Sequence, residues 1–358
     1  MRKMDQKKIV FFTGSMGRGG AERVISILSE YFVCQNWDVT IVMLLHNRAD
    51  GYALNDKVKV KTFFPENSGM VKKIICDIRN IRSYIKKIKP DVLVFFMAQN
   101  TLVSGIACAG LGIRYIASER IDPAMVKRNF IYKKILNSLY RRADKVIFQT
   151  ERAKNYFNKK IQNNSVIIGN PISVDFEATR TLKKIVSAGR FTKQKNQKML
   201  IDAFSMVVKK HPEYVLEIYG EGKERQNLEK QIHELGLENY VFLPGNKKNL
   251  HECIKDAEIF VLPSNFEGLS NALLEAMMMG FGCISTNCAG SDEVIVSGEN
   301  GILVPVGNKE ELEKAIINLI ENEQLRIKIA RNGKKSVEKF KVENIIDQWT
   351  KVIEGDKL

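Results

Sequence analysis

A short apolar run at Ile259–Leu262 ends in a Pro-Ser turn and leads into residues that can bind a polar ligand. The N–H groups at the start of the helix predicted next attract phosphate, and Ser270 or Asn271 is its expected N-cap. Glu267, on the loop, can accept hydrogen bonds from sugar hydroxyls, and Glu275, two turns into the helix, can hold a ribose diol. The alternatives are an ordinary loop charge for Glu267 and a partly buried structural carboxylate for Glu275.

A second set of charged residues follows the predicted strand Lys184–Ala188. Arg190 and Lys195 project from the carboxyl end of a parallel sheet, where a leaving diphosphate would need neutralising. Two solvated surface cations are the alternative, which we accept for the neighbouring Lys193. For Arg190 and Lys195 the position at the strand end favours a function.

A glycine-rich turn lies between the first predicted strand and the first predicted helix. Gly17 and Gly19 allow the backbone to approach a ligand closely, and the free N–H groups of the helix start favour an anion. The spacing is not that of a dinucleotide-binding fingerprint, because Arg23 or Val24 stands where the third glycine would fall. A tight turn that serves helix–sheet packing explains the turn equally well.

Short apolar, β-branched runs alternate with helix-length segments along the whole chain, which predicts parallel sheets covered by helices on both faces. The alternation breaks at Gly169–Leu182. We therefore predict an α/β protein with two tandem, Rossmann-like, doubly wound parallel-sheet domains that face each other across a cleft. The predicted parts are an N-terminal domain (1–170), a linker (171–182), a second domain (183–340) and a C-terminal helix (341–358) that packs back on the first domain. The predicted strands are Ile9–Thr13, Val39–Leu44, Val58–Thr62, Val92–Phe96, Tyr115–Ala117, Val146–Gln149, Val166–Ile168, Lys184–Ala188, Val215–Tyr219, Val241–Leu243, Ile259–Leu262, Cys283–Ser285 and Gly301–Val304.

The composition is that of a globular protein, with 44% hydrophobic and 27% charged residues among 358. It excludes a disordered, collagen-like or disulfide-scaffold chain. Residues 1–180 hold 31 basic and 15 acidic residues, a net charge of +16, whereas residues 181–358 have a net charge of −1. The basic half predicts an anionic partner: nucleic acid, an anionic bilayer or a phosphorylated substrate. A soluble, lysine-rich surface is the alternative.

Two basic amphipathic stretches account for much of this charge. One runs from Val71 to Ile88, and the other from Val126 to Arg142. We expect their apolar stripes to cover the first sheet. We expect their basic faces to bind an anionic membrane, since each basic residue near such a surface contributes about 1 kcal/mol.

Other compositional features concern the compartment and metals. The six cysteines form no Cys-x-x-Cys pair and mostly fall in apolar runs, which predicts free buried thiols in a reducing, cytoplasmic setting. Four scattered histidines and the absence of Asp-x-Asp predict no metal site. The first residues do not resemble a signal peptide. The uncharged run Val92–Ile113 is interpreted as a strand, a loop and a helix rather than a membrane span.

Five motifs, in order along essentially the whole chain, resemble those of the retaining, nucleotide-sugar-dependent glycosyltransferases of family 4, which have the GT-B fold. Glu267-x7-Glu275 resembles the Glu-x7-Glu motif of that family. Gly-Gly-Ala-Glu-Arg-Val at 19–24 matches the acceptor-side loop of members that build polysaccharides and lipid-linked oligosaccharides. Gly189-Arg190 with Lys195-Asn196 matches the diphosphate-binding pair. Tyr219–Gly222 resembles the glycine turn that follows the second strand of the family's donor domain. Ala289–Glu293, after the predicted strand Cys283–Ser285, resembles the family's loop at that place.

The resemblance implies roles for individual residues. Arg190 and Lys195 would stabilise the departing nucleoside diphosphate, and with Glu267, which holds the donor sugar, they form the implied catalytic set. Glu275 would bind the ribose. The implied donor-binding set is Gly17, Gly19, Arg190, Lys195, Gly220, Gly222, Glu267, Gly268, Leu269, Ser270, Asn271 and Glu275, and the acceptor-side set is Arg18, Arg23, Glu119 and Arg120.

The sequence also departs from the family pattern. Ser118-Glu119-Arg120 stands where many members carry a histidine, so Glu119 is the candidate for its hydrogen-bonding role. Gly280-Phe281-Gly282 replaces the common Gly-x-Pro, a change we expect to alter only a turn.

The sequence as a whole predicts transfer of a hexose or N-acetylhexosamine from a UDP-sugar to a lipid-linked glycan, without cofactor or metal, at the inner face of the cell membrane. One alternative is a nucleotide-sugar epimerase, which would not need Glu-x7-Glu. Another is a glycosyltransferase with a soluble acceptor, which would not need a basic first domain. A nucleic-acid-binding module also explains the charge, but aromatic residues are not interleaved with the basic stretches as stacking platforms would be. We therefore expect no nucleic acid partner.

Overall fold

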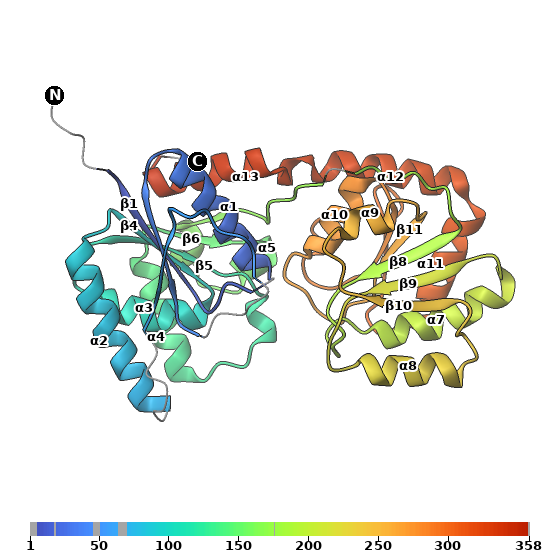
Figure 1. Cartoon of the computed structure of the whole chain (residues 1–358), viewed down its shortest axis with the longest axis horizontal. Coiled ribbons are helices and arrows are strands. Elements are labelled where there is room, and N and C mark those ends of the chain that lie inside the picture. The colour runs from blue at the N-terminus through green and yellow to red at the C-terminus, as the bar shows by residue number, and fades with distance from the viewer. Residues whose placement is uncertain (1–5, 18, 46–50, 64–69, 175, 357–358) are drawn as a thin grey trace. The chain divides into compact units, whose positions relative to one another are not determined.

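The computed structural model describes residues 6–17, 19–45, 51–63, 70–174 and 176–356, and of residues 70–73 only the backbone. The chain folds into two compact units (Figure 1). The N-terminal unit consists of Met1–Asn170 and Glu343–Leu358, and the C-terminal unit of Pro171–Val342. The last helix therefore belongs to the same unit as the first strand.

The N-terminal unit is built on a parallel sheet whose described strands run in the order β3-β2-β1-β4-β5-β6-β7. Strand order reverses between β1 and β4, where Phe11 pairs with Ile41 on one side and with Val94 on the other. Such a reversal opens a crevice beyond the carboxyl ends of the strands. The strands are β1 (Lys8–Thr13), β2 (Asp38–Met43), β3 (Lys59–Thr62), β4 (Val92–Phe96), β5 (Arg114–Ser118), β6 (Lys145–Phe148) and β7 (Ser165–Ile167).

Helices cover both faces of this sheet, with α2, α3 and α4 on one side and α1 and α13 on the other (Figure 1). Adjacent residues of a strand point to opposite faces, so Phe95 packs with Ile81 and Ile85 of α2 while Phe96 stacks on Trp349 of α13. The helices are α1 (Gly20–Cys34), α2 (Met70–Ile88), α3 (Ala98–Cys108), η1 (Pro123–Met125), α4 (Phe130–Arg142), α5 (Glu151–Asn155), α6 (Lys159–Asn163) and α13 (Val342–Glu354).

The C-terminal unit repeats the plan with a parallel sheet in the order β10-β9-β8-β11-β12-β13. Here the strand order reverses between β8 and β11, which pair through Ile259–Ile185 and Phe260–Val186. The strands are β8 (Lys184–Ala188), β9 (Val215–Tyr219), β10 (Val241–Gly245), β11 (Ile259–Leu262), β12 (Gly282–Thr286) and β13 (Ile302–Val304).

The core of this unit is formed by apolar strand residues and the buried faces of α7, α8 and α11. The helices α10 and α12 pack against each other on the opposite side of the sheet from α7 and α8 (Figure 1). The helices are α7 (Gln197–Lys210), α8 (Arg225–Glu234), α9 (Leu250–Ile254), α10 (Asn271–Met279), α11 (Lys309–Glu321), α12 (Glu323–Val337) and η2 (Glu338–Phe340).

The predicted fold class is confirmed, because both units are parallel α/β sheets and every predicted strand matches an observed one to within about two residues. The uncharged run Val92–Ile113 forms β4 and α3, as expected. Among the described residues, no helix has the length and apolar character that crossing a bilayer requires.

Two predictions about buried side chains were partly wrong. In the stripe of α2, Ile81 and Ile85 are buried, but Ile74 and Ile75 are exposed, because among the side chains that the structure describes the apolar contacts with the sheet begin near Ile78. In the second stripe, Leu136 and Leu139 are buried, whereas Val126, Phe130 and Ile131 are exposed. The cysteines are free thiols; Cys108, Cys283 and Cys288 are buried, but Cys34 and Cys76 are exposed.

Candidate functional site

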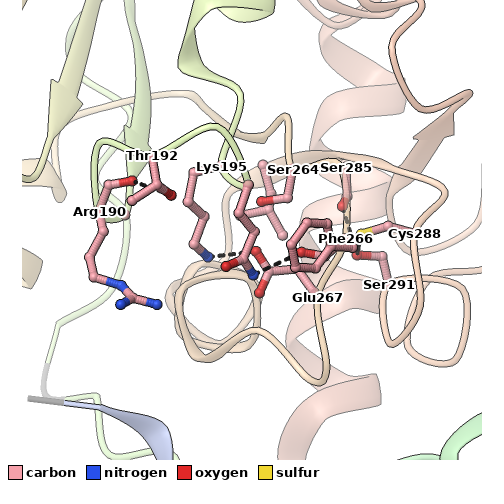
Figure 2. A network of polar contacts seen from close by, with 12 residues as sticks. Arg190, Thr192, Lys195, Ser264, Phe266, Glu267, Ser285, Cys288 and Ser291 are labelled. Atoms are coloured by element: carbon pink, nitrogen blue, oxygen red, sulfur yellow. Dashed lines mark hydrogen bonds and ion pairs between the residues drawn. The ribbon is translucent and has the colours of Figure 1, made fainter. Parts of the chain in front are cut away.

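Two loops of the C-terminal unit meet where the strand order reverses. The loop after β8 carries Lys195 and the loop after β11 carries Glu267, whose side chains point toward one another in Figure 2. The distance from Lys195 Nζ to Glu267 Oε1 is 2.6 Å, and the side chains are 14% and 9% exposed. Residues far apart in sequence thus form an ion pair at the edge where doubly wound sheets bind ligands.

The backbone after β8 accounts for the position of Lys195. A turn closes between Lys195 N and Thr192 O (3.0 Å), and Asn196 adopts a left-handed conformation (φ 48°) just before α7. A side chain at Gly189 would place its Cβ 3.2 Å from Lys195 Cε. Glycine at this position therefore leaves room for the aliphatic part of the lysine.

Gln194 joins the two loops at two points. Its side chain donates a hydrogen bond to the Phe266 carbonyl (3.0 Å), and its own carbonyl accepts one from Asn265 N (2.8 Å). Asn265 also bonds Lys193 O and Asn196. Because Gln194 precedes Lys195 and Phe266 precedes Glu267, these bonds hold the two loops together and keep Lys195 beside Glu267. Gln194 was not among the predicted site residues, since no sequence motif marks a contact between two loops.

Helix α10 begins at Asn271, four residues after Glu267. Its N-cap residue is Ser270, one of the two residues predicted for this position. The Ser270 hydroxyl makes no capping hydrogen bond, and the first turn contains no acidic residue. The buried Ser264 and Ser270 hydroxyls both lack a hydrogen-bond partner among the described residues. The positive end of this helix is therefore not neutralised by its own first turn, and it can accept an anion.

Glu275 lies on α10 and is hydrogen-bonded to a residue that was not among the predicted site residues. His251 Nε2 of α9 is 3.1 Å from Glu275 Oε2. Both side chains are largely buried, with 22% and 13% exposed. His251 therefore fixes the orientation of the carboxylate. The sequence holds only four histidines, but nothing in their spacing connects this one to Glu275.

The loop after β12 supports the Glu267 loop from behind. Gly290 has φ 82°, and a Cβ there would lie 1.6 Å from the Gly268 carbonyl oxygen, so only glycine fits. At the end of β12, just before this loop, Thr286 Oγ1 donates to Ser264 O (2.5 Å). Burial raises the pKa of the neighbouring Cys288 thiol, which keeps it protonated. The end of β12 and the loop after it thus pack closely against the backbone of the loop that carries Glu267.

Gly220 and Gly222 lie against the backbone of the β8 loop. A Cβ at Gly220 would be 2.0 Å from the Gly189 carbonyl oxygen, and one at Gly222 would be 2.3 Å from that of Phe191. The structure thus gives both glycines a packing role. Arg190, on the same loop, is exposed, whereas Leu269 is buried.

In the N-terminal unit, the glycine-rich turn follows β1 and leads into α1, as predicted. Gly19 is the N-cap of α1 and accepts a hydrogen bond from Arg23 N at 3.0 Å. Gly17 is buried. Arg18, an expected acceptor-side residue, lies outside the described residues.

Glu119 and Arg120 lie inside this unit rather than on its surface. Glu119 Oε2 accepts hydrogen bonds from Arg128 Nη2 (2.9 Å) and Tyr140 Oη (3.1 Å). Burial raises the pKa of Glu119, and the Arg128 guanidinium opposes this effect. Arg120 lies over the rings of Phe96 and Trp349, and burial lowers its pKa to about 9. Both side chains thus contribute to the interior packing of the unit.

Metal ligands are not clustered in the described part of the chain, where no group of three or more His, Cys, Asp or Glu side chains is arranged to hold an ion.

Comparison with known proteins gives two family matches that divide the chain between them. Residues 18–176 match the model described as "Glycosyltransferase Family 4", and residues 172–336 match the model described as "Glycosyl transferases group 1". A glycosyltransferase of Haemophilus influenzae is 26% identical over 97% of this chain and 100% of its own length.

Two further proteins are similar over nearly the whole chain. One is the Campylobacter jejuni α-1,4-N-acetyl-D-galactosaminyltransferase that acts on an undecaprenol-linked glycan. It is 25% identical over 97% of this chain and 98% of its own. The crystal structure of Anabaena HepE with UDP and glucose superposes with a TM-score of 0.81 at 20% identity, covering 98% of this chain and 100% of that one. The two family matches and this shared fold indicate that the chain is a GT-B glycosyltransferase.

Proposed function

We propose that this enzyme transfers a hexose or N-acetylhexosamine from a UDP-sugar to a lipid-linked glycan, with retention of anomeric configuration and without a metal, at the inner face of the cell membrane. The observation that carries the proposal is the Lys195–Glu267 pair, 2.6 Å apart beside the start of α10. It combines a cation for a diphosphate with a carboxylate for sugar hydroxyls at one sheet edge.

The donor half of the proposal rests on the charges around α10. The exposed Arg190, the Lys195 ammonium and the start of α10, whose first turn holds no acidic residue, together provide positive charge for a leaving diphosphate. When a donor binds, Lys195 turns from Glu267 to the diphosphate, and Glu267 is released to hydrogen-bond the sugar. Glu275, held by His251, is suited to the ribose hydroxyls. HepE, which has the same fold, has been crystallised with UDP and UDP-glucose.

In the proposed reaction the bond between the anomeric carbon and the diphosphate oxygen breaks. The acceptor hydroxyl oxygen bonds to that carbon on the same face, and its proton passes to the departing diphosphate. Arg190 and Lys195 stabilise the charge that develops on the diphosphate. Glu267 acts by position, not as a covalent nucleophile.

The acceptor half of the proposal rests on relatives and on charge. The Campylobacter jejuni relative acts on an undecaprenol-diphosphate-linked glycan, and an amylovoran biosynthesis glycosyltransferase of Erwinia amylovora is 24% identical over 97% of this chain. The excess positive charge of residues 1–180 fits an acceptor that is presented at an anionic bilayer.

The test is a panel of UDP-sugars assayed for UDP release with a polyprenyl-diphosphate-linked sugar as acceptor. We expect one or a few donors to give turnover that persists in EDTA, and NMR to show the anomeric configuration of the donor in the product. An inverted product, a trapped Glu267–sugar adduct or strict metal dependence would contradict the mechanism. Release of UDP with water-soluble acceptors alone would contradict the lipid-linked acceptor.

A further inference from the structure

The first turn of α4 exposes two large apolar side chains. Phe130 is 79% exposed and Ile131 is 69% exposed, the highest values among large hydrophobic residues in the part of the chain that the structure describes. Asn129 caps the helix by accepting a hydrogen bond from Tyr132 N at 2.8 Å. The two side chains are thus presented from a capped helix.

The rest of α4 explains why these side chains are not part of the core. Leu136, Leu139 and Tyr140 are buried against the sheet. At 100° per residue, Phe130 and Ile131 lie on the opposite face of the helix. They therefore point away from the sheet, although they continue the same apolar pattern in the sequence.

Further apolar and basic residues surround the pair. Met125 and Val126, just before α4, are also exposed, at 47% and 36%. Residues 123–143 contain six basic residues and no acidic one. We define the α4 patch as the exposed residues Met125, Val126, Lys127, Phe130, Ile131, Lys133 and Lys134.

This combination selects among the partners that an apolar patch can have. A second copy of the chain would bring two basic patches together, which like-charge repulsion opposes. A nucleic acid would need several aromatic stacking platforms, whereas the patch holds one aromatic residue, Phe130. An anionic bilayer matches both features, because apolar side chains enter the boundary of the acyl chains while lysines remain at the phosphates.

We propose that the α4 patch is a membrane-insertion element, in which Phe130 and Ile131 enter an anionic bilayer and Lys127, Lys133 and Lys134 contact its headgroups. The proposal deepens the membrane part of the proposed function. It adds to the basic face expected on α2, of which Lys86 and Lys87 are exposed. The side chains of Lys72 and Lys73 lie outside the described residues.

The test is sedimentation of the full chain with vesicles of phosphatidylglycerol and phosphatidylcholine, compared with vesicles of phosphatidylcholine alone. The wild type is expected to bind the anionic vesicles. Phe130→Ser with Ile131→Ser should lower the partition coefficient at least about tenfold. A matched control, Leu182→Ser with Val296→Ser, changes exposed apolar residues of the other unit and should bind as the wild type does.

Two further measurements separate insertion from charge attraction. Raising the salt concentration should weaken the binding of the wild type to anionic vesicles. Some binding should remain at high salt, and the Phe130→Ser, Ile131→Ser variant should lack it. The fluorescence of a Phe130→Trp variant should be quenched by brominated acyl chains in the vesicles, which requires contact with the bilayer interior.

Several results would overturn the proposal: a wild type that does not bind anionic vesicles, a serine variant that binds as tightly as the wild type, or a tryptophan that is not quenched. Loss of RNA binding rather than vesicle binding in the serine variant would also overturn it. UDP release with a short, water-soluble analogue of the lipid-linked acceptor should persist in that variant. If the vesicle results hold while every donor fails, the proposed function fails and the membrane proposal stands.

Discussion

The two units have the same strand order around their reversal points, but they differ in the exposure of the ion pair that follows a strand at the carboxyl edge of the sheet. Next to β8 and β11, Lys195 and Glu267 remain partly accessible, and Arg190 is exposed. In the N-terminal unit, the ion pair beyond β5 joins Arg128 and Glu119, whose side chains are only 5% and 1% exposed. An accessible pair can exchange its partner for a ligand, whereas a sealed pair can only hold the fold. The topology alone therefore does not identify a site.

The largest effect is expected on stability, from a change in the buried Arg128–Glu119 pair. Glu119→Gln leaves the Arg128 charge buried without its counter-ion, which should lower the free energy of unfolding by about 3–5 kcal/mol. Urea denaturation measures this change, with Asp56→Asn, at an exposed acid of the same unit, as the control. If stability is unchanged and only turnover with the acceptor falls, Glu119 is an acceptor-binding residue and the contrast between the units is wrong.

The accessible cations should affect turnover instead. Arg190→Ala and Lys195→Ala are each expected to lower turnover by about 10²–10³, because each removes a preorganised charge that stabilises the leaving diphosphate. Circular dichroism and thermal unfolding should show that both variants remain folded. Lys193→Ala changes an exposed lysine of the same loop and is the control. Near-wild-type turnover in both Arg190→Ala and Lys195→Ala would contradict their proposed role in stabilising the diphosphate.

The carboxylate of the accessible pair should have a smaller effect on rate. Glu267→Gln keeps part of the hydrogen bonding but loses the charge, so kcat should fall about tenfold while donor binding stays measurable by calorimetry. Loss of donor binding with an unchanged kcat per bound donor would instead make Glu267 a simple binding residue.

The smallest effect is expected for the residue that joins the two loops. Gln194→Ala removes one neutral hydrogen bond to Phe266 O and should lower kcat about three- to tenfold, with little change in donor affinity. Gln194→Glu is isosteric but cannot donate that bond when ionised, so it should not restore the rate. Gln35→Ala, at an exposed glutamine, is the control. Full activity in Gln194→Glu would show that the bond does not position the ion pair.

Much of this fold follows from sequence patterns. Buried parallel strands are continuous apolar runs such as Val92–Phe96, and their alternation with helices leaves few other architectures. Arg190, Lys195 and Glu267 could be selected because each follows a strand whose carboxyl end faces the ligand edge. The Lys195–Glu267 contact was not predicted, since it depends on two loops being joined by Gln194.

Side-chain burial was harder to predict than secondary structure. Phe130 and Leu136 are both apolar residues in one amphipathic stretch, yet one is exposed and the other buried. Periodicity gives the faces of a helix, but which part of the helix overlaps the sheet is decided by tertiary packing. The same limit applies to Glu119 and Arg120, whose polar sequence Ser-Glu-Arg gives no indication that they are buried.

The return of α13 to the first unit has a consequence for synthesis. Trp349 covers Phe96 and Arg120, which leave the ribosome roughly 250 and 230 residues earlier. Until α13 is synthesised, the Phe96 ring and the Arg120 guanidinium remain exposed to solvent. The N-terminal unit therefore emerges first from the ribosome but completes its folding last. A nascent chain arrested before Val342 would be expected to recruit chaperones through this surface. Supplying α13 as a separate peptide would then be expected to displace them.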